Sequence, residues 1–257
     1  MNFPSTVLPE KSWSLSKQIL YSVMYESGAS FVCGAPDGKV FAVQYPGKPL
    51  WLYADENWGK ENLLIFFDYI AKTLFDKNSK IQTDGLITSK WAADICPWPA
   101  KASWELAAFY LPKPLPHISM QGYSLTYPKK TDIPILSEWI KDFYLTALDT
   151  AIENEYIAKA IINSRNFYCL KFDNEDLAAM GMLVPLPYGM CRLNLIYTPP
   201  GLRNKGLGKK ITAAISYEAQ KRGSLPCLYA RVDNEPACAL YRSLGFVEAG
   251  RLMELRF

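Results

Sequence analysis

Apolar side chains in the second half of the chain recur with two spacings, one typical of helices and one typical of strands. Spacings of three and four residues, which place side chains on one face of a helix, occur in two groups. They are Leu136, Trp139, Ile140 and Phe143, and Leu207, Ile211, Ala214 and Ile215. Thr131 or Asp132 can cap the first helix, and Gly223 can end the second. The pattern predicts two amphipathic helices that each bury one face.

Apolar runs around these helices have the lengths of strands. Further helices are expected over residues 150–163 and 235–244. Strands are expected at 123–127, 166–172, 178–185, 190–198, 225–232 and 246–257. The predicted order of this half is β-α-α-β-β-β-α-β-α-β. It indicates a mixed α/β (α+β) fold, in which a central mixed sheet is flanked by helices on both faces.

The first half of the chain gives weaker signals of the same kind. Helices are expected at 15–26 and 62–76, strands at 50–53, 85–88 and 103–111, and a hairpin in FVCGAPDGKVFAV around Pro36, Asp37 and Gly38. The stretch YLPKPLPHI (110–118) holds three prolines in five residues, which suit neither a helix nor a central strand. We therefore predict an N-terminal α/β domain over 1–112, a Pro-rich linker over 113–120 and a second domain over 121–257.

Composition narrows the classes of function. The chain has 257 residues, of which 49% are hydrophobic and 21% charged, as in globular proteins. The net charge of +3 is too small to indicate a nucleic-acid or membrane-surface partner. Because the N-terminus lacks a signal-peptide pattern and no apolar run reaches about 18 residues, we expect a cytoplasmic protein.

Metal and histidine chemistry are not expected. The six cysteines are scattered without a C-x-x-C pair, which favours free thiols and no metal site. Cys191 and Cys238 are interpreted as small core residues. The one histidine, His117, lies in the Pro-rich linker, so a histidine-based hydrolase is nearly excluded.

One basic, glycine-rich segment, YTPPGLRNKGLGKKITAAI (197–215), separates a predicted strand from a predicted helix. It is not a Walker A loop, because Leu207 stands where the lysine belongs. It is not a dinucleotide fingerprint either, because Ile211 replaces the third glycine. Gly206 and Gly208 would still let the backbone approach a ligand closely.

The same segment favours an anion on physical grounds. It leads into a helix N-terminus, where N–H groups lack intrahelical partners and the helix dipole attracts negative charge. Arg203, Lys205, Lys209 and Lys210 add formal charge. A pyrophosphate would suit this loop, although an ordinary turn before a solvated basic helix has the same sequence features.

A second segment, YARVDNEPACALYRSLGF (229–246), follows about 25 residues later. The R-x-x-G-x-G pattern of Arg203, Gly206 and Gly208 after a strand, then a strand ending at Asn234 and a helix with ALYRSLGF, resembles the GNAT superfamily of acyl-CoA-dependent N-acetyltransferases. The loop is similar to that of predicted bacterial acetyltransferases with YTPP-x-x-R-x-K-G. The resemblance covers the C-terminal part. In the N-terminal part, the order of elements suggests a degenerate GNAT-like half.

The resemblance implies roles for particular residues. The backbone of Leu195, Ile196 and Tyr197 would pair with the pantetheine arm, and an N–H near Ile196 or Tyr197 would meet the oxyanion. Asn234 would contact the arm of the cofactor, and Tyr241 would protonate the departing thiolate. The CoA pyrophosphate would be held by the backbone of Arg203, Asn204, Lys205, Gly206, Leu207, Gly208 and Lys209.

The general base stays open. Many members of the superfamily use a glutamate on the strand before the loop, but CRLNLIY (191–197) has no carboxylate. Glu153, Glu155 and Glu248 are candidates by location only, and a water chain would serve as well.

The resemblance therefore implies an acetyltransferase. It would move an acetyl group from acetyl-CoA to a primary amine by direct attack in a ternary complex, without a metal, nucleic-acid or membrane partner. The N-terminal domain would form one wall of the acceptor site. Two alternatives stay open: an acyl-CoA-binding or regulatory module without turnover, and a different anion binder such as a phosphosugar or nucleotide protein.

Overall fold

The computed structural model describes most of the predicted elements. The described residues are 31–34, 39–44, 50–54, 59–74, 80–84, 102–115, 119–148, 162, 164–186 and 189–256. The helices are α2 (Lys60–Leu74), α4 (Ile133–Leu148), α6 (Leu207–Lys221) and α7 (Glu235–Ser243), with short 3₁₀ turns η2 (Lys130–Asp132) and η3 (Pro200–Leu202). The strands are β1 (Phe31–Gly34), β2 (Val40–Gln44), β3 (Leu50–Ala54), β4 (Lys80–Asp84), β5 (Ala102–Tyr110), β6 (Tyr123–Thr126), β7 (Phe167–Phe172), β8 (Leu177–Leu186), β9 (Met190–Tyr197), β10 (Leu225–Arg231) and β11 (Val247–Arg256).

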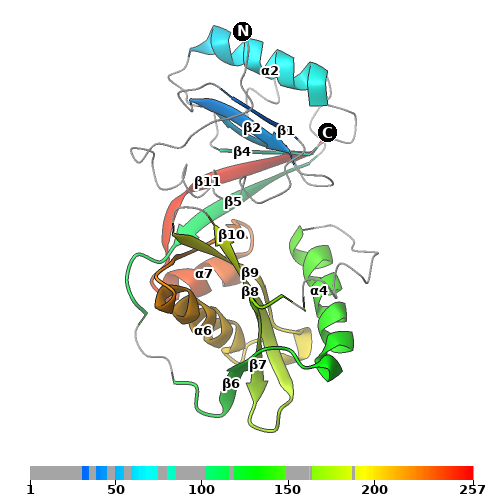
Figure 1. Ribbon diagram of the computed structural model, residues 1–257, viewed down its shortest axis with the longest axis vertical. Coiled ribbons are helices and arrows are strands. Elements are labelled where there is room, and N and C mark those ends of the chain that lie inside the picture. The colour runs from blue at the N-terminus through cyan, green and yellow to red at the C-terminus, as the bar shows by residue number, and fades with distance from the viewer. Residues whose placement is uncertain are drawn as a thin grey trace.

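These strands form one continuous mixed sheet with the order β1-β2-β3-β4-β11-β5-β10-β9-β8-β7-β6. In the C-terminal half, α4 lies on one face of the sheet and α6 and α7 lie on the other (Figure 1). The predicted fold class, a central mixed sheet flanked by helices, is confirmed.

Both ends of the sheet repeat one pairing pattern. At one end β1, β2 and β3 are antiparallel and β3 is parallel to β4, with α2 between the last two in sequence. At the other end β7, β8 and β9 are antiparallel and β9 is parallel to β10, with α6 between them. A glycine with positive φ comes immediately before each of these helices: Gly59 at 90° before α2 and Gly206 at 74° before α6.

The two ends meet through two long strands at the centre. β5, from the first half of the sequence, lies between β10 and β11 and is antiparallel to both. β11, from the end of the chain, lies between β5 and β4 and is antiparallel to both. The predicted boundary at residue 112 therefore divides the sequence at a point where the sheet itself is continuous.

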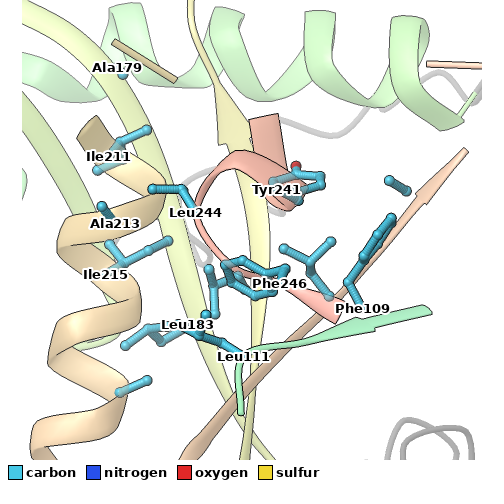
Figure 2. Close-up of a cluster of buried hydrophobic side chains, with 14 of the residues drawn as sticks. Phe109, Leu111, Ala179, Leu183, Ile211, Ala213, Ile215, Tyr241, Leu244 and Phe246 are labelled. Atoms are coloured by element: carbon cyan, nitrogen blue, oxygen red, sulfur yellow. The ribbon is translucent and has the colours of Figure 1, made fainter. Parts of the chain in front are cut away.

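The core on the α6 and α7 face is large and apolar. Ile211 and Ile215 of α6 pack toward β8, while Tyr241 of α7 packs with Phe109 of β5 and with Phe246 (Figure 2). A smaller cluster on the opposite face joins Leu136 and Ile140 of α4 to β7, β8 and β9. The helical spacings seen in the sequence are thus explained by burial on two different faces.

Most predicted elements are confirmed to within two residues at each end. The predicted helices at 15–26 and 150–163, the predicted strand at 85–88 and the turn residues Pro36, Asp37 and Gly38 lie outside the described residues. The strand β4 was not predicted, because KIQTD alternates without a strong apolar signal. Asp132 is one of the two residues predicted to cap α4. Its side chain accepts the backbone N–H of Lys129 at 2.7 Å and so closes the turn η2 that precedes the helix.

Gly181 of β8 gives a first testable prediction, because α6 packs closely over it. A Cβ at this position would lie 2.9 Å from Ile215 Cδ1 and 3.3 Å from Ile211 Cγ1. Gly181→Ala is therefore expected to lower the free energy of unfolding by about 1–3 kcal/mol through overpacking. Urea unfolding measures it, with Gly201→Ala as control, since nothing lies within 4 Å of a Cβ there. Equal stability of both variants would contradict this packing.

Candidate functional site

The sheet opens between β9 and β10. The two parallel strands pair only where Leu225, Pro226 and Cys227 face residues 190–192. Beyond this point β10 pairs only with β5, so residues 193–197 of β9 have no strand on this side within the described part of the chain. Backbone groups at such an edge can pair with an extended ligand, as an added strand does. Leu195, Ile196 and Tyr197, the predicted partners of a pantetheine arm, all lie in this open stretch.

A bulge changes the direction of β9 within the opening. Met182 pairs with Asn194, but Met180 pairs with Tyr197, so β9 carries an extra residue between these pairs. Leu195 has a φ of 52°, and its N–H donates to the Asn194 side chain at 2.9 Å. Bulges of this kind turn backbone groups away from the sheet and often occur beside functional sites.

The basic loop follows directly after β9. Arg203 Nε donates to the Thr198 carbonyl at 3.1 Å, and its guanidinium lies 5.9 Å from the centre of the Tyr197 ring. Asn204 and Gly206 have positive φ values of 63° and 74°, which turn the chain sharply into α6. The first backbone bond of this helix runs from Lys210 N–H to Gly206 O, so the N–H groups of 207–209 face outward without helical partners.

An unpaired hydroxyl lies beside this helix N-terminus. Thr198 Oγ1 is buried and has no hydrogen-bond partner among the described residues. A Cβ on Gly208 would lie 3.8 Å from this oxygen and 3.2 Å from Leu240 Cδ1, so a larger residue would crowd the space between them. Because buried polar groups are normally satisfied, the Thr198 hydroxyl is a fitting partner for a polar ligand at this helix end.

The cations of the loop divide into two groups. Arg203, Lys205 and Lys209 are exposed at the loop. Lys210 instead reaches the linker: its Nζ donates to the Ser119 carbonyl at 3.0 Å and lies 4.8 Å from the centre of the Tyr123 ring. The positive charge available to an anion is therefore concentrated on the first three residues.

The two predicted residues on and before α7 are placed differently from each other. Asn234 is exposed and caps α7, where its Oδ1 accepts the Ala237 N–H at 3.3 Å. Tyr241 is buried, with its ring centre 5.9 Å from those of Phe109 and Phe246, and its hydroxyl points away from Phe246 (Figure 2). Burial raises the pKa of Tyr241, so the phenol keeps its proton at neutral pH.

Glu248, one of the base candidates, is held as an anion. Its carboxylate bonds to Arg251 Nε and lies 3.3 Å from Arg242 Nη2. Burial pushes the pKa of Glu248 up, but the two arginines outweigh it and hold the pKa below its usual range. A carboxylate so stabilised is a poor proton acceptor. Glu153 and Glu155 lie outside the described residues.

The cysteines beside the opening are buried free thiols, as expected. Burial raises the pKa of Cys191 to about 11 and raises that of Cys238 as well, so neither is a ready nucleophile. The described part of the chain holds no group of three or more His, Cys, Asp and Glu side chains that could bind a metal. No helix among the described residues is long and apolar enough to cross a membrane.

The sequence reasoning missed one polar pair at the end of β9. The Tyr197 hydroxyl donates a hydrogen bond to Asp142 Oδ2 of α4, and the ring of Trp139 lies 5.8 Å from that of Tyr197. Burial, followed by the bond to Asp142, raises the pKa of Tyr197 to about 12. Trp139 and Asp142 are three residues apart, a spacing that indicates a shared helix face. Nothing in the sequence shows which residue 55 positions away Asp142 contacts.

Comparisons with known proteins agree with this geometry. A family model described as FR47-like protein matches residues 172–254. A search of the curated proteins found no match. Among solved structures, a GCN5-related N-acetyltransferase from Kribbella flavida is similar over 95% of this chain and 96% of its own, with 15% identity and a TM-score of 0.65.

Two further solved structures have the same arrangement. A GNAT-family acetyltransferase from Colwellia psychrerythraea covers 95% of this chain and 94% of its own, with 13% identity and a TM-score of 0.60. A GCN5-related N-acetyltransferase from Sphaerobacter thermophilus covers 88% and 79%, with 14% identity and a TM-score of 0.59. The chain therefore has the fold of GNAT acetyltransferases.

Proposed function

We propose that the protein is an N-acetyltransferase that moves an acetyl group from acetyl-CoA to a primary amine, by direct attack in a ternary complex. The observation that carries this proposal is the open edge of β9, which is followed in the chain by the basic loop and then by the N-terminus of α6. An extended arm and a pyrophosphate are the two ends of one ligand, CoA, and the site offers an edge for the first and free N–H groups for the second.

Different residues of the site would bind different parts of the ligand. The backbone of Leu195, Ile196 and Tyr197 would pair with the pantetheine arm. The backbone from Arg203 to Lys209 would hold the pyrophosphate, with Arg203 and two lysines near its charge. The buried Thr198 hydroxyl would donate to, or accept from, the part of the ligand that passes Gly208. Asn234, already bonded to its own helix, would contact the arm from the exposed side.

Tyr241 would act on the sulfur. When the amine attacks the thioester, the sulfur leaves with the electron pair of the C–S bond. A phenol whose pKa is raised by burial is protonated at neutral pH and can give its proton to this thiolate. The main-chain N–H near the bulge, at Ile196 or Tyr197, would hydrogen-bond the carbonyl oxygen as it gains negative charge.

The first half of the chain would be a degenerate copy of the same half-sheet. It repeats the antiparallel strands, the parallel pair and the glycine with positive φ before the helix. It lacks an R-x-x-G-x-G segment before α2, so we assign it no cofactor. In this proposal residues 1–112 form one wall of the acceptor site, 113–120 connect, and 121–257 bind acetyl-CoA.

A second function, acyl-CoA binding without turnover, is favoured by one observation. The strand before the loop has Arg192 and Asn194 where many members of the superfamily have a carboxylate. This module would share the ligand site with the enzyme but would not release free CoA in the presence of amines.

Thermal unfolding with acetyl-CoA, CoA, ATP and NAD tests the proposal. A ligand at a hundredfold excess over its Kd should stabilise the protein by about 2.7 kcal/mol, a shift of several degrees in Tm. We expect this shift with acetyl-CoA and CoA and none of comparable size with ATP or NAD. Thiol release with added primary amines then separates an acetyltransferase from a binding module. Absence of any shift with CoA would overturn both.

A further inference from the structure

The two faces of the opening between β9 and β10 differ in what covers them. On the α6 and α7 face, buried side chains such as Leu207, Ile211 and Tyr241 fill the space against the sheet. On the other face stands α4 (Figure 1), whose Leu136 and Ile140 belong to a smaller apolar cluster that includes Tyr197. The Trp139 ring of α4 lies 5.8 Å from the Tyr197 ring at the end of β9. A polar acceptor cannot enter through a packed apolar core without a large desolvation cost. The apolar cluster on the α4 face is the smaller of the two and has the half-buried Trp139 at its margin, so we place the approach of the amine beside Trp139 on that face.

A cavity lies on that face. It has a volume of about 420 Å³ and runs between α4, the turn from β7 to β8, and the loop. All its lining residues belong to 121–257, so the wall proposed for residues 1–112 would lie outside this cavity. Trp139 lines it from α4, and Leu202 lines it from the loop. The lining includes the carboxylates of Asp132, Glu175 and Asp176 but neither Tyr197 nor Asp142. Trp139 contacts the cavity on one side and Tyr197 on the other, and so connects this space to the end of β9.

Asp142 is the carboxylate that bonds to the side chain at the end of β9. It lies three residues after Trp139 on α4 and is partly exposed. Its Oδ2 accepts the Tyr197 hydroxyl, while no residue in the described part of the chain bonds to its Oδ1. The Tyr197 ring is fixed in turn by Trp139 and by the guanidinium of Arg203. One oxygen of Asp142 is therefore held in place, and the other can meet a ligand.

We propose that Asp142 is the catalytic carboxylate that binds the ammonium group of the acceptor and takes its proton, and that Tyr197 positions it. This assignment rests on the proposed function and gives it the general base that the strand before the loop does not supply. Tyr197 is the last residue of β9 and follows Ile196, whose N–H is a candidate for the oxyanion contact. In this proposal the thioester carbonyl lies at Ile196, next to the residue whose side chain holds Asp142.

The transfer conserves protons and electron pairs. The acceptor arrives as an ammonium ion and hydrogen-bonds to Asp142 Oδ1. Its nitrogen loses one proton to Asp142 and forms a C–N bond to the thioester carbonyl carbon, while the C–S bond breaks. The sulfur leaves as a thiolate and takes the proton of Tyr241. The second proton that the amide nitrogen must lose passes through water to the Tyr241 phenolate, which restores the phenol. Asp142 returns its proton to water after the amide departs, so no oxidant, reductant or metal is needed. General bases of this kind typically contribute about 10²–10⁴-fold in rate.

Few charged or titratable groups among the described residues face Asp142. Tyr197 faces it from β9, and burial keeps this phenol protonated with a pKa of about 12. Arg203 lies against the far side of the Tyr197 ring. On α4 itself, Lys141 is the neighbouring residue and pairs with Glu138 at 2.8 Å. None of these described groups bonds to Asp142 except Tyr197.

The test compares three variants with the wild type in acetyl transfer to propylamine, spermidine and L-lysine. Asp142→Asn is expected to lower kcat by about 100-fold at neutral pH, the low end for loss of a general base, with an unchanged Kd for acetyl-CoA. Its residual rate should rise with pH as the free amine becomes available, whereas the wild-type rate should vary less. Tyr197→Phe should raise KM for the amine and lower kcat by a smaller factor. Asp68→Asn, on the exposed face of α2, is the matched control and should behave as wild type.

The outcomes separate this assignment from the proposed function. Wild-type protein that binds no acetyl-CoA overturns the proposed function itself. Protein that binds acetyl-CoA but acetylates none of the three amines overturns the transfer, and the assignment with it. Active protein whose Asp142→Asn variant keeps its kcat and its pH profile overturns the assignment alone. An equal loss of acetyl-CoA binding and of Tm in Asp142→Asn and Tyr197→Phe also overturns it, because the pair would then be structural.

Discussion

An Arg203→Glu, Gly206→Asp double variant is expected to weaken acetyl-CoA binding by at least about 100-fold, because like charges about 4 Å apart near a protein surface repel by about 4 kcal/mol. The changes make the loop more negative by three charge units, directly where the pyrophosphate would lie. They also remove the guanidinium that bonds to the Thr198 carbonyl. Isothermal titration of acetyl-CoA measures the loss.

The variant should still fold. A Cβ at Gly206 would meet no atom within 4 Å, and aspartate is among the residues that best tolerate the positive φ of this position. A matched control exists at the other end of the same helix, where Gly223 also has a positive φ of 73° and open space. Lys221→Glu, Gly223→Asp makes the same charge change about 22 Å away along a 15-residue helix. If the control weakens binding as much as the loop variant, the ligand site is not at the loop.

Lys171→Met is expected to cost about 3–5 kcal/mol of unfolding free energy, because it leaves a buried charge without its partner. Lys171 of β7 is almost fully buried, with 2% of its side chain exposed, and its Nζ lies 2.9 Å from Asp132 Oδ2 and 3.1 Å from Oδ1. Asp132 has 11% of its side chain exposed and also accepts the Lys129 N–H. The pair therefore fastens the start of α4 to β7. Equilibrium unfolding in urea measures the cost.

Two further variants separate pairing from packing. A Lys171→Met, Asp132→Leu double variant should recover most of the stability, since apolar replacement of a whole buried pair is often neutral or better. Lys129→Met breaks the pair with Glu175, in which both side chains are more than half exposed, and should cost at most about 1 kcal/mol. A double variant as unstable as Lys171→Met would show that the loss comes from packing instead of charge.

The sequence predicts the local structure of the C-terminal half well because its signals are local. The helical spacing of Leu207, Ile211 and Ile215 and the glycine-rich turn before them need only a few neighbouring residues to be interpreted. The loop position is confirmed for the same reason: a strand, two prolines and two glycines determine where α6 begins. The role of Tyr241 is predicted only through the resemblance of its segment to the GNAT superfamily. Its burial between Phe109 and Phe246 depends on a strand from the other half of the chain.

The missed features all depend on contacts between distant residues. The Asp142–Tyr197 and Asp132–Lys171 pairs join residues 55 and 39 positions apart, and neither has a pattern in the sequence. The insertion of β5 between β10 and β11 is equally invisible, since ASWELAAFY predicts a strand but not its neighbours. The position of the basic loop could thus be predicted from the sequence, whereas the contact between Asp142 and Tyr197 could not.

The position of β5 and β11 has a consequence for how the chain can be divided. The last strand of each half is inserted between two strands of the other half: β11 lies between β4 and β5, and β5 lies between β11 and β10. A fragment that ends at residue 112 would lack β11 beside β4, and one that begins at residue 121 would lack β5 beside β10. Each fragment would expose unpaired strand edges that invite aggregation. We therefore expect each fragment to fold only in the presence of the other, so the two would have to be co-expressed.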